Sequence, residues 1–251
     1  RGPNGQVVGN AHTGPVPHRF DVPYLFRGHL VTASWEVPKA AAWSAETPSL
    51  YEATVELIGV NGSVLDTRTQ RIGIKRVEVI GRQLLVNGQP IWIHGVNRHD
   101  HHPDRGKALT AADIRADLEV MRAHNITAIR TSHYPNDTAF YDLCDELGMY
   151  VVDEANIESH AYNTSICNDP RYRSAFVERG ARMVQRDRNH ACIIEWSLGN
   201  ESGYGVNHDA LAGWIRADDP TRPLHYEGAT FHGDHLLPAT GLVDPAAEAL
   251  P

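Results

Sequence analysis

The chain has 251 residues, of which 41% are hydrophobic and 22% are charged, a composition typical of a globular protein with a sizeable core. Its formal net charge is -8 and its Lys and Arg residues are scattered, which argues against a nucleic-acid partner. No run of about 18 apolar residues occurs, so the sequence predicts no transmembrane helix and no membrane partner.

The N-terminal stretch and the cysteines favour a cytoplasmic protein. The stretch RGPNGQVVGNAHTG lacks the apolar core of a secretion signal. Cys144, Cys167 and Cys192 have no metal-type spacing, and two of them fall within the apolar pattern of a predicted helix or strand. We therefore expect reduced thiols in the core.

The first part of the chain predicts an irregular lead-in followed by antiparallel strands. Residues 1–28 are rich in Gly, Pro, His and Asn and show no sustained periodicity. In residues 29–76, HLVTASWEV, YEATVELIGV and SVLDTRTQRIGI alternate or run apolar at strand length. The last two are joined at Asn61-Gly62, a strong hairpin signal. These strands indicate a small antiparallel sandwich that lacks some of its strands.

A second hairpin-like pair, VEVI and QLLVN, leads into residues 77–228, where strands alternate with helices. The predicted strands are IWIHGV, ITAIRTSH, MYVVDEAN, CIIEWSLGNE and PLHYEG. Apolar spacing predicts helices over 110–124 and 137–147, one opening at Asp169-Pro170, and one carrying Leu211, Trp214 and Ile215. This alternation is typical of a parallel α/β sheet or barrel. Residues 229–251 show neither a convincing helix nor a strand.

Polar residues follow four of the five predicted strands, at 97–103 (NRHDHHP), 130–135 (RTSHYP), 153–160 (DEANIESH) and 200–201 (NE). Parallel α/β folds bind ligands at the carboxyl ends of their strands, so this concentration is expected of a catalytic rim. Glu201 ends a strand that is apolar almost throughout. There a glutamate can donate a proton if burial raises its pKa, or can bind a cation.

Simpler interpretations remain open for the rim residues. Glu201 can merely cap the helix that follows it. His99, His101 and His102 can form a solvated loop, or a His-x-His metal pair in a metal-dependent hydrolase. The metal interpretation requires further ligands on later strands, and none is clear in the sequence.

Charged residues at the second and third predicted strands are expected to pair with one another. Asp153 and Glu154 lie deep in a strand, where a charge must be paired, and Arg130 is their expected partner. Glu158 and His160 are two residues apart, so on an extended segment they would point the same way, as two ligands of one cation would.

Three segments carry a resemblance to a known family: GVNRHDHHP, RTSHYPNDTAFYDLCDELGMYVVDEANIESHA and MVQRDRNHACIIEWSLGNESGYGVNHDAL. They resemble glycoside hydrolase family 2, and within it the large bacterial β-galactosidases, over residues 35–228. The resemblance implies an incomplete immunoglobulin-like β-sandwich over 29–76 and a partial (β/α)₈ TIM barrel of about five strands over 77–228. The implied reaction is hydrolysis of terminal β-D-galactosides with retention. Family members acting on glucuronides or mannosides are the alternative, and they are expected to differ at HDHHP and EANIESH.

The resemblance also assigns roles to rim residues. Glu201 resembles the family's acid/base. The residues that resemble sugar contacts are His99, His133 and Asn200. The residues that resemble ligands of an active-site Mg²⁺ are Glu158, His160 and Glu201.

The chain departs from the family pattern at the nucleophile. Retention requires a second carboxyl group about 5 to 5.5 Å from the acid/base. No segment after Glu201 resembles the family's nucleophile, and Glu227 is the best-placed carboxylate in the chain, although its approach geometry is expected to be wrong. Glu195 replaces an expected aliphatic residue and would need a basic partner if buried, and Thr127 replaces an expected Asn.

We therefore interpret the chain as the central part of a β-galactosidase, weakly active at best by itself. Open strand edges predict a homo-oligomer or completion by another chain. A non-catalytic carbohydrate-binding or assembly fragment is the alternative from another class.

Overall fold

A parallel sheet forms the centre of the molecule in the computed structural model, which describes residues 1–16, 31, 33–34, 36–162 and 164–231. Its strands are β6 (Gly95–Arg98), β7 (Ala128–Thr131), β8 (Tyr150–Glu154), β9 (Ile193–Ser197) and β10 (Leu224–His225). They lie in the order β10-β9-β8-β7-β6, and every neighbouring pair is parallel. The predicted five-strand part of a barrel is confirmed.

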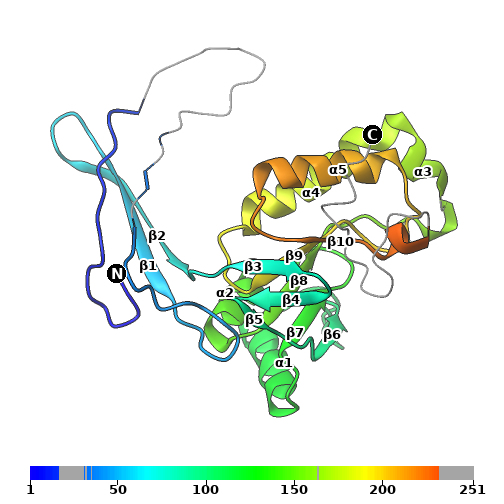
Figure 1. The fold of residues 1–251 in the computed structure, drawn as a ribbon, viewed down its shortest axis with the longest axis horizontal. Helices are drawn as coiled ribbons and strands as arrows, with labels where there is room; N and C mark the ends of the chain where they lie inside the picture. Colours follow the sequence, from blue (N-terminus) through cyan, green and yellow to red (C-terminus); the bar gives the residue numbers. More distant parts are fainter. Residues whose placement is uncertain (17–30, 32, 35, 163, 232–251) are drawn as a thin grey trace.

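Helices connect these strands as the apolar spacing predicted. They are α1 (Ala111–Ala123), α2 (Thr138–Leu147), α4 (Arg173–Asp187) and α5 (Val206–Asp218). Between β8 and α4 the chain also forms η1 (His160–Tyr162) and α3 (Thr164–Asn168), which the sequence did not predict, and η2 (Pro170–Tyr172), which begins at the predicted Asp169-Pro170 start. Figure 1 shows α4 beside α5, and α1 packs beside α2.

The helix boundaries follow from capping residues. A capping box begins α1: the Thr110 hydroxyl accepts from the Asp113 backbone N–H, and the Asp113 carboxylate accepts from the Thr110 backbone N–H. Asp137 caps α2, and Gly148, with φ 73°, ends it in the left-handed conformation. Asp169 caps η2 and not α4, which begins three residues after Pro170.

The N-terminal part contributes one hairpin, formed by β1 (Tyr51–Ile58) and β2 (Val64–Ile72). Gly62 has φ 82° at the predicted Asn-Gly turn, so the hairpin prediction is confirmed. In Figure 1 this hairpin projects away from the parallel sheet. The segment HLVTASWEV lies partly outside the described residues, and its described residues form no strand. Residues 232–251 of the predicted tail also lie outside the described part.

A small antiparallel sheet, β3 (Val77–Ile80), β4 (Gln83–Val86) and β5 (Gln89–Pro90), packs on the core through Val77 and Val86. Trp43 joins this region to the barrel part. It is fully buried, its indole N–H donates to the Asp145 carbonyl at 2.9 Å, and its carbonyl accepts from Asn87 Nδ2 at 3.0 Å.

Strand β9 is buried on both faces, because all five of its residues are buried. This confirms the interpretation of CIIEWS as a strand covered by helices. Cys144, Cys167 and Cys192 are free and buried, as expected. Among the described residues, no helix combines the length and hydropathy that a membrane span requires.

Glu195 is the exception within β9. Its exposed fraction is 6%, and its Oε1 atom has no hydrogen-bond partner among the described residues. The part of the chain that the structure describes holds no basic partner for Glu195, contrary to the expectation, and burial raises the pKa of this carboxyl to about 8. The side chain is therefore largely protonated at pH 7.

Glu195→Gln should flatten the pH dependence of stability. The folded-state pKa of Glu195 lies above the unfolded value of 4.5, so the folded chain holds an additional proton between these values, and stability falls as pH rises from 4.5 to 8. We expect the variant to match the wild type near pH 5 and to exceed its unfolding free energy at pH 8.5 by about 1 to 3 kcal/mol. Urea unfolding, followed by circular dichroism at each pH, measures the unfolding free energies of the variant and the wild type. Glu56→Gln, at an exposed position on β1, is the matched control and should leave the slope unchanged. A wild-type slope retained in Glu195→Gln would contradict this assignment.

Candidate active site

Glu201 lies where the chain leaves β9 and turns along the carboxyl edge of the sheet. Gly199 makes the turn possible, because its φ is 136° and a Cβ atom there would lie 2.5 Å from the Ile157 carbonyl oxygen. The next backbone N–H, of Asn200, donates to that same carbonyl at 2.8 Å. Glu201 then adopts φ 39°, and its side chain is 53% exposed at the rim.

Asn200 is buried beside Glu201 and is held from two strands. Its Oδ1 atom accepts from Arg130 at 2.9 Å, and its Nδ2 atom donates to Glu158 Oε1 at 3.3 Å. The side chain of Asn200 is therefore fixed in orientation before any sugar arrives.

A buried carboxylate, Glu154, organises the rim below Asn200. Its Oε2 atom accepts from Arg130 Nε and from the Ser197 hydroxyl, both at 2.6 Å, and its Oε1 atom lies 2.6 Å from His133 Nδ1. Burial raises the pKa of Glu154, while these three partners oppose the rise. The expected pairing of Arg130 with Asp153 or Glu154 is confirmed for Glu154. Asp153 instead accepts from the hydroxyls of Thr131 and Tyr141.

His99 and His133 lie together above this network. Their rings meet edge to face with centroids 5.5 Å apart, and the Tyr134 hydroxyl lies 3.5 Å from His99 Nδ1. Partial burial and then the neighbouring His133 lower the pKa of His99, which favours a neutral imidazole. A neutral imidazole can donate and accept at once, as contact with sugar hydroxyls requires.

Among the described residues, the His-x-His pair of His99 and His101 belongs to no group of three side chains that could hold a metal ion. His102 accepts the backbone N–H groups of Asp104 and Arg105 at Nδ1, at 3.1 and 3.3 Å, and so stabilises a turn, while His101 is exposed. Within the described ranges, one group of three side chains brings metal-ligand atoms within 4.8 Å of one another: Asp142, Asp145 and His190. That group lies outside the rim, and its Asp145 is used by Cys192 N–H and His190.

The structure brings together two of the three side chains predicted to bind Mg²⁺. His160 Nδ1 lies 2.6 Å from Glu201 Oε2. Glu158 contacts Asn200, the neighbour of Glu201, through its side chain and a backbone bridge, but the ligand atoms of the three side chains do not all lie within 4.8 Å of one another. All three side chains are exposed, so a bound cation would keep water ligands, as Mg²⁺ usually does. The donor set of two carboxylates therefore suits a hard cation, and the predicted site stays a prediction.

Glu227 and Tyr226 also belong to the rim, although the sequence predicted only Glu227 as a candidate. Glu227 Oε1 accepts the Glu201 backbone N–H at 2.7 Å, and its Oε2 atom lies 3.7 Å from Arg130. The role of Tyr226 had no sequence signal, because its hydroxyl contacts a backbone 24 residues away.

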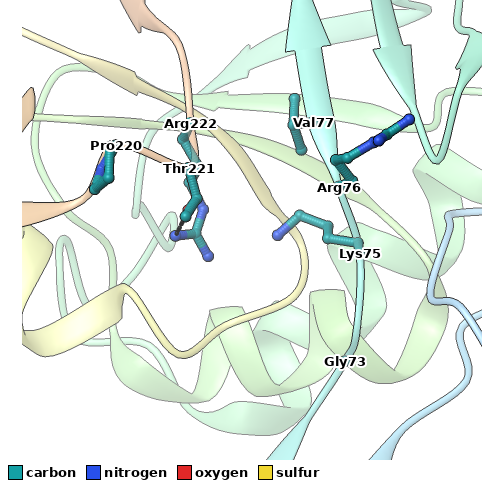
Figure 2. Close-up of a pocket in the computed structure, with 7 residues that line it drawn as sticks. All are labelled: Gly73, Lys75, Arg76, Val77, Pro220, Thr221 and Arg222. Atoms are coloured by element: carbon teal, nitrogen blue, oxygen red, sulfur yellow. Dashed lines mark hydrogen bonds between the residues drawn. The ribbon is translucent and has the colours of Figure 1, made fainter. Parts of the chain in front are cut away.

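A separate pocket of about 380 Å³ lies away from the rim, lined by residues that precede β3 and β10. Figure 2 shows Lys75 pointing into the space beside Arg222, and burial followed by Arg222 lowers the pKa of Lys75 to about 7. The guanidinium of Arg222 already donates to Asp219 and to three carbonyl oxygens, so it is not available to a ligand. We therefore take the rim, and not this pocket, as the candidate active site.

Two family models match the chain. The model described as "Glycosyl hydrolases family 2, TIM barrel domain" matches residues 77–242, and "Glycosyl hydrolases family 2" matches residues 9–75. A β-galactosidase of Erwinia tasmaniensis is 49% identical over 226 residues, which cover 88% of this chain and 22% of the relative. A β-galactosidase of Pectobacterium atrosepticum is 51% identical over 195 residues, 77% of this chain and 19% of the relative. The chain thus spans about a fifth of the length of the curated relatives it matches.

Two solved structures of other glycosidases share the fold. A β-glucuronidase from Ruminococcus gnavus in complex with D-glucuronic acid superimposes with a TM-score of 0.67 at 27% identity, covering 75% of this chain and 33% of that one. A family 2 β-galacturonidase from Eisenbergiella tayi bound to galacturonate superimposes with a TM-score of 0.67 at 28% identity. The match covers 77% of this chain and 35% of that one. With the rim geometry and the matched barrel model, these relationships show that the chain belongs to glycosyl hydrolase family 2.

Proposed function

We propose that the protein carrying this chain hydrolyses terminal β-D-galactosides with retention, and that the chain supplies the acid/base side of the site. The observation that carries the proposal is Glu201, half-exposed at the end of β9 between the fixed amide of Asn200 and His160. The names of relatives that are 49–51% identical support galactoside over uronide, since the uronide-binding structures are 27–28% identical.

Glu201 would act twice. It donates its proton to the glycosidic oxygen as that C–O bond breaks and a second carboxylate bonds to the anomeric carbon. It then removes a proton from the water that attacks the anomeric carbon, which releases the sugar and the second carboxylate. Such a group must reach both leaving group and water, and its exposure allows this.

The Arg130–Glu154 pair would hold the residues that bind the sugar. Arg130 fixes Asn200, and Glu154 fixes His133, so an amide and an imidazole converge with preset orientation beside Glu201. We place the nucleophile outside the 251 residues, because Glu227 is occupied by the Glu201 backbone and by Arg130. The protein would work in the cytoplasm, which the buried free thiols support.

The leaving group tests the role of Glu201. In a hybrid in which this chain replaces the matching segment of the Erwinia tasmaniensis β-galactosidase, Glu201→Gln should lower kcat/KM for an alkyl galactoside by about 10²- to 10⁴-fold. Dinitrophenolate leaves without being protonated, so the substitution should slow cleavage of a dinitrophenyl galactoside much less. Azide, which needs no general base, should accelerate turnover of the variant.

Glu119→Gln is the matched control for that experiment, because its side chain is 62% exposed on α1. Equal losses with both leaving groups would contradict an acid role for Glu201. A hybrid that hydrolyses glucuronides in preference to galactosides would contradict the proposal that galactosides are the substrates.

We also propose that Glu158, His160 and Glu201 hold Mg²⁺, whose positive charge would favour the charged form of nearby carboxylates. Calorimetric titration of Mg²⁺ into the chain should detect binding that Glu158→Gln weakens at least about tenfold, since a hard cation depends on anionic oxygen ligands. Glu119→Gln should bind as the wild type does. Equal binding by Glu158→Gln and the wild type would remove Glu158 from the site.

Besides the substrate, we propose a second copy of the chain as a binding partner. Exposed apolar side chains occur on the β1–β2 hairpin, where Val55 and Leu65 are 69% and 64% exposed, and before β6, where Trp92 is 82% exposed. Sedimentation velocity should show species larger than a monomer as concentration rises, and Trp92→Ser should reduce them. A single monomeric species at every concentration would contradict the proposal.

A further inference from the structure

The two residues that follow β10 bind the backbone around Glu201. Glu227 Oε1 accepts the Glu201 N–H at 2.7 Å, and the Tyr226 hydroxyl accepts the Ser202 N–H at 3.1 Å. The same hydroxyl donates to the Gly203 carbonyl at 2.5 Å. Three consecutive residues of the loop, 201–203, are thus held by two consecutive side chains, which we call the β10 clamp (Tyr226 and Glu227).

The loop requires such support at Glu201. A φ of 39° is left-handed, a conformation that residues with a Cβ atom disfavour. The Glu201 side chain is about half exposed, so packing around it does not fix its backbone. A carboxylate acceptor for the backbone N–H supplies a strong, directional restraint.

The β10 clamp is itself rigid. Tyr226 is fully buried, and its ring stacks on His208 with centroids 4.3 Å apart. Gly228 lets the loop approach closely, because a Cβ atom there would lie 2.6 Å from the Gly203 carbonyl oxygen. Glu227 lies 3.7 Å from Arg130, which also binds Asn200, so one cation connects the clamp to the neighbour of Glu201.

We propose that Glu227 is a positioning residue for Glu201: it holds the backbone that sets where the Glu201 carboxyl reaches, and Tyr226 holds the two residues that follow. The inference rests on the proposed acid/base role of Glu201. It differs from a nucleophilic role for Glu227, because the carboxylate of Glu227 faces the Glu201 amide and not a sugar.

Substitution by Gln separates the two roles. Gln keeps an oxygen that accepts the Glu201 N–H, whereas Ala removes it. A positioning residue should therefore tolerate Gln and not Ala, while a nucleophile should be abolished by both.

Hydrogen exchange of backbone amides, measured by NMR on the whole 251-residue chain, tests the contact. Glu227→Ala should raise the exchange rate of the Glu201 amide about tenfold or more, and Glu227→Gln should keep it within about threefold, since one hydrogen bond is at stake. Tyr226→Phe should raise exchange at Ser202 and leave Glu201 unchanged. The Val151 amide, which donates to the Cys192 carbonyl in the core, reports whether each variant stays folded.

Kinetics of the hybrid then test the role. Glu227→Ala should lower kcat/KM for the alkyl galactoside more than for the dinitrophenyl galactoside, as loss of acid assistance does. Glu227→Gln should keep both kcat/KM values near those of the wild-type hybrid. The inference would be overturned if Glu227→Gln and Glu227→Ala had equal effects on amide exchange or on kcat/KM. It would also be overturned if Glu227→Ala left the exchange rate of the Glu201 amide unchanged. An inactive wild-type hybrid with the expected exchange pattern would refute the proposed function and leave the clamp contact standing.

Discussion

The buried ion pair between Glu154 and Arg130 is the interaction on which the rim depends. Glu154 is fully buried at the end of β8, where an unpaired charge would be strongly unfavourable, so its partners are obligatory. They come from β7, from the residues after it, and from β9: Arg130, His133 and Ser197. One carboxylate thereby fixes the relative position of three strand ends. Because Arg130 extends from Glu154 to Asn200 and Glu227, its placement also decides the surroundings of Glu201.

The register of the parallel sheet makes this pairing possible. Glu154 lies opposite Ser197 across the β8–β9 pair, and Arg130 lies opposite Val152 across β7–β8, so these polar side chains share a face near the carboxyl edge. The register places Glu195 in the same row as Arg130, on the other side of Val152, and the next row down on β7 and β8, Ala128 and Tyr150, is hydrophobic. A polar layer above an apolar one is what a barrel needs if its lower part is to pack and its upper part is to bind a ligand.

Local signals in the sequence predicted much of this arrangement. Thr110, Asp137 and Gly148 fixed helix boundaries, because capping depends on neighbours within one turn. Asn61-Gly62 fixed the hairpin for the same reason. Residues that follow strands identified the rim, since the ends of parallel strands converge.

Contacts between distant segments could not be predicted in this way. The Tyr226 hydroxyl reaches backbone groups 23 and 24 residues away, and the left-handed φ of Glu201 has no signature in a residue type that rarely adopts it. The helical turns between β8 and α4 are short, so no apolar period reveals them. Glu195 was recognised as unusual, but its protonated state follows from the absence of a cation near it among the described residues, which only a three-dimensional structure reveals.

Three of the glutamates at the rim, Glu154, Glu201 and Glu227, differ in environment, and these differences bear on the roles that each can fill. Glu154 is enclosed by Arg130, Ser197 and His133, so a proton transferred to it would break contacts that hold the strands together. Glu227 is 32% exposed, but one of its oxygens is held by a backbone N–H. Glu201 is 53% exposed, and among the described residues its carboxylate contacts one exposed histidine, which is the environment that the proposed acid/base role requires. Chemically identical side chains within one network are thus suited to different roles, because they differ in burial and in the number of donors they must satisfy.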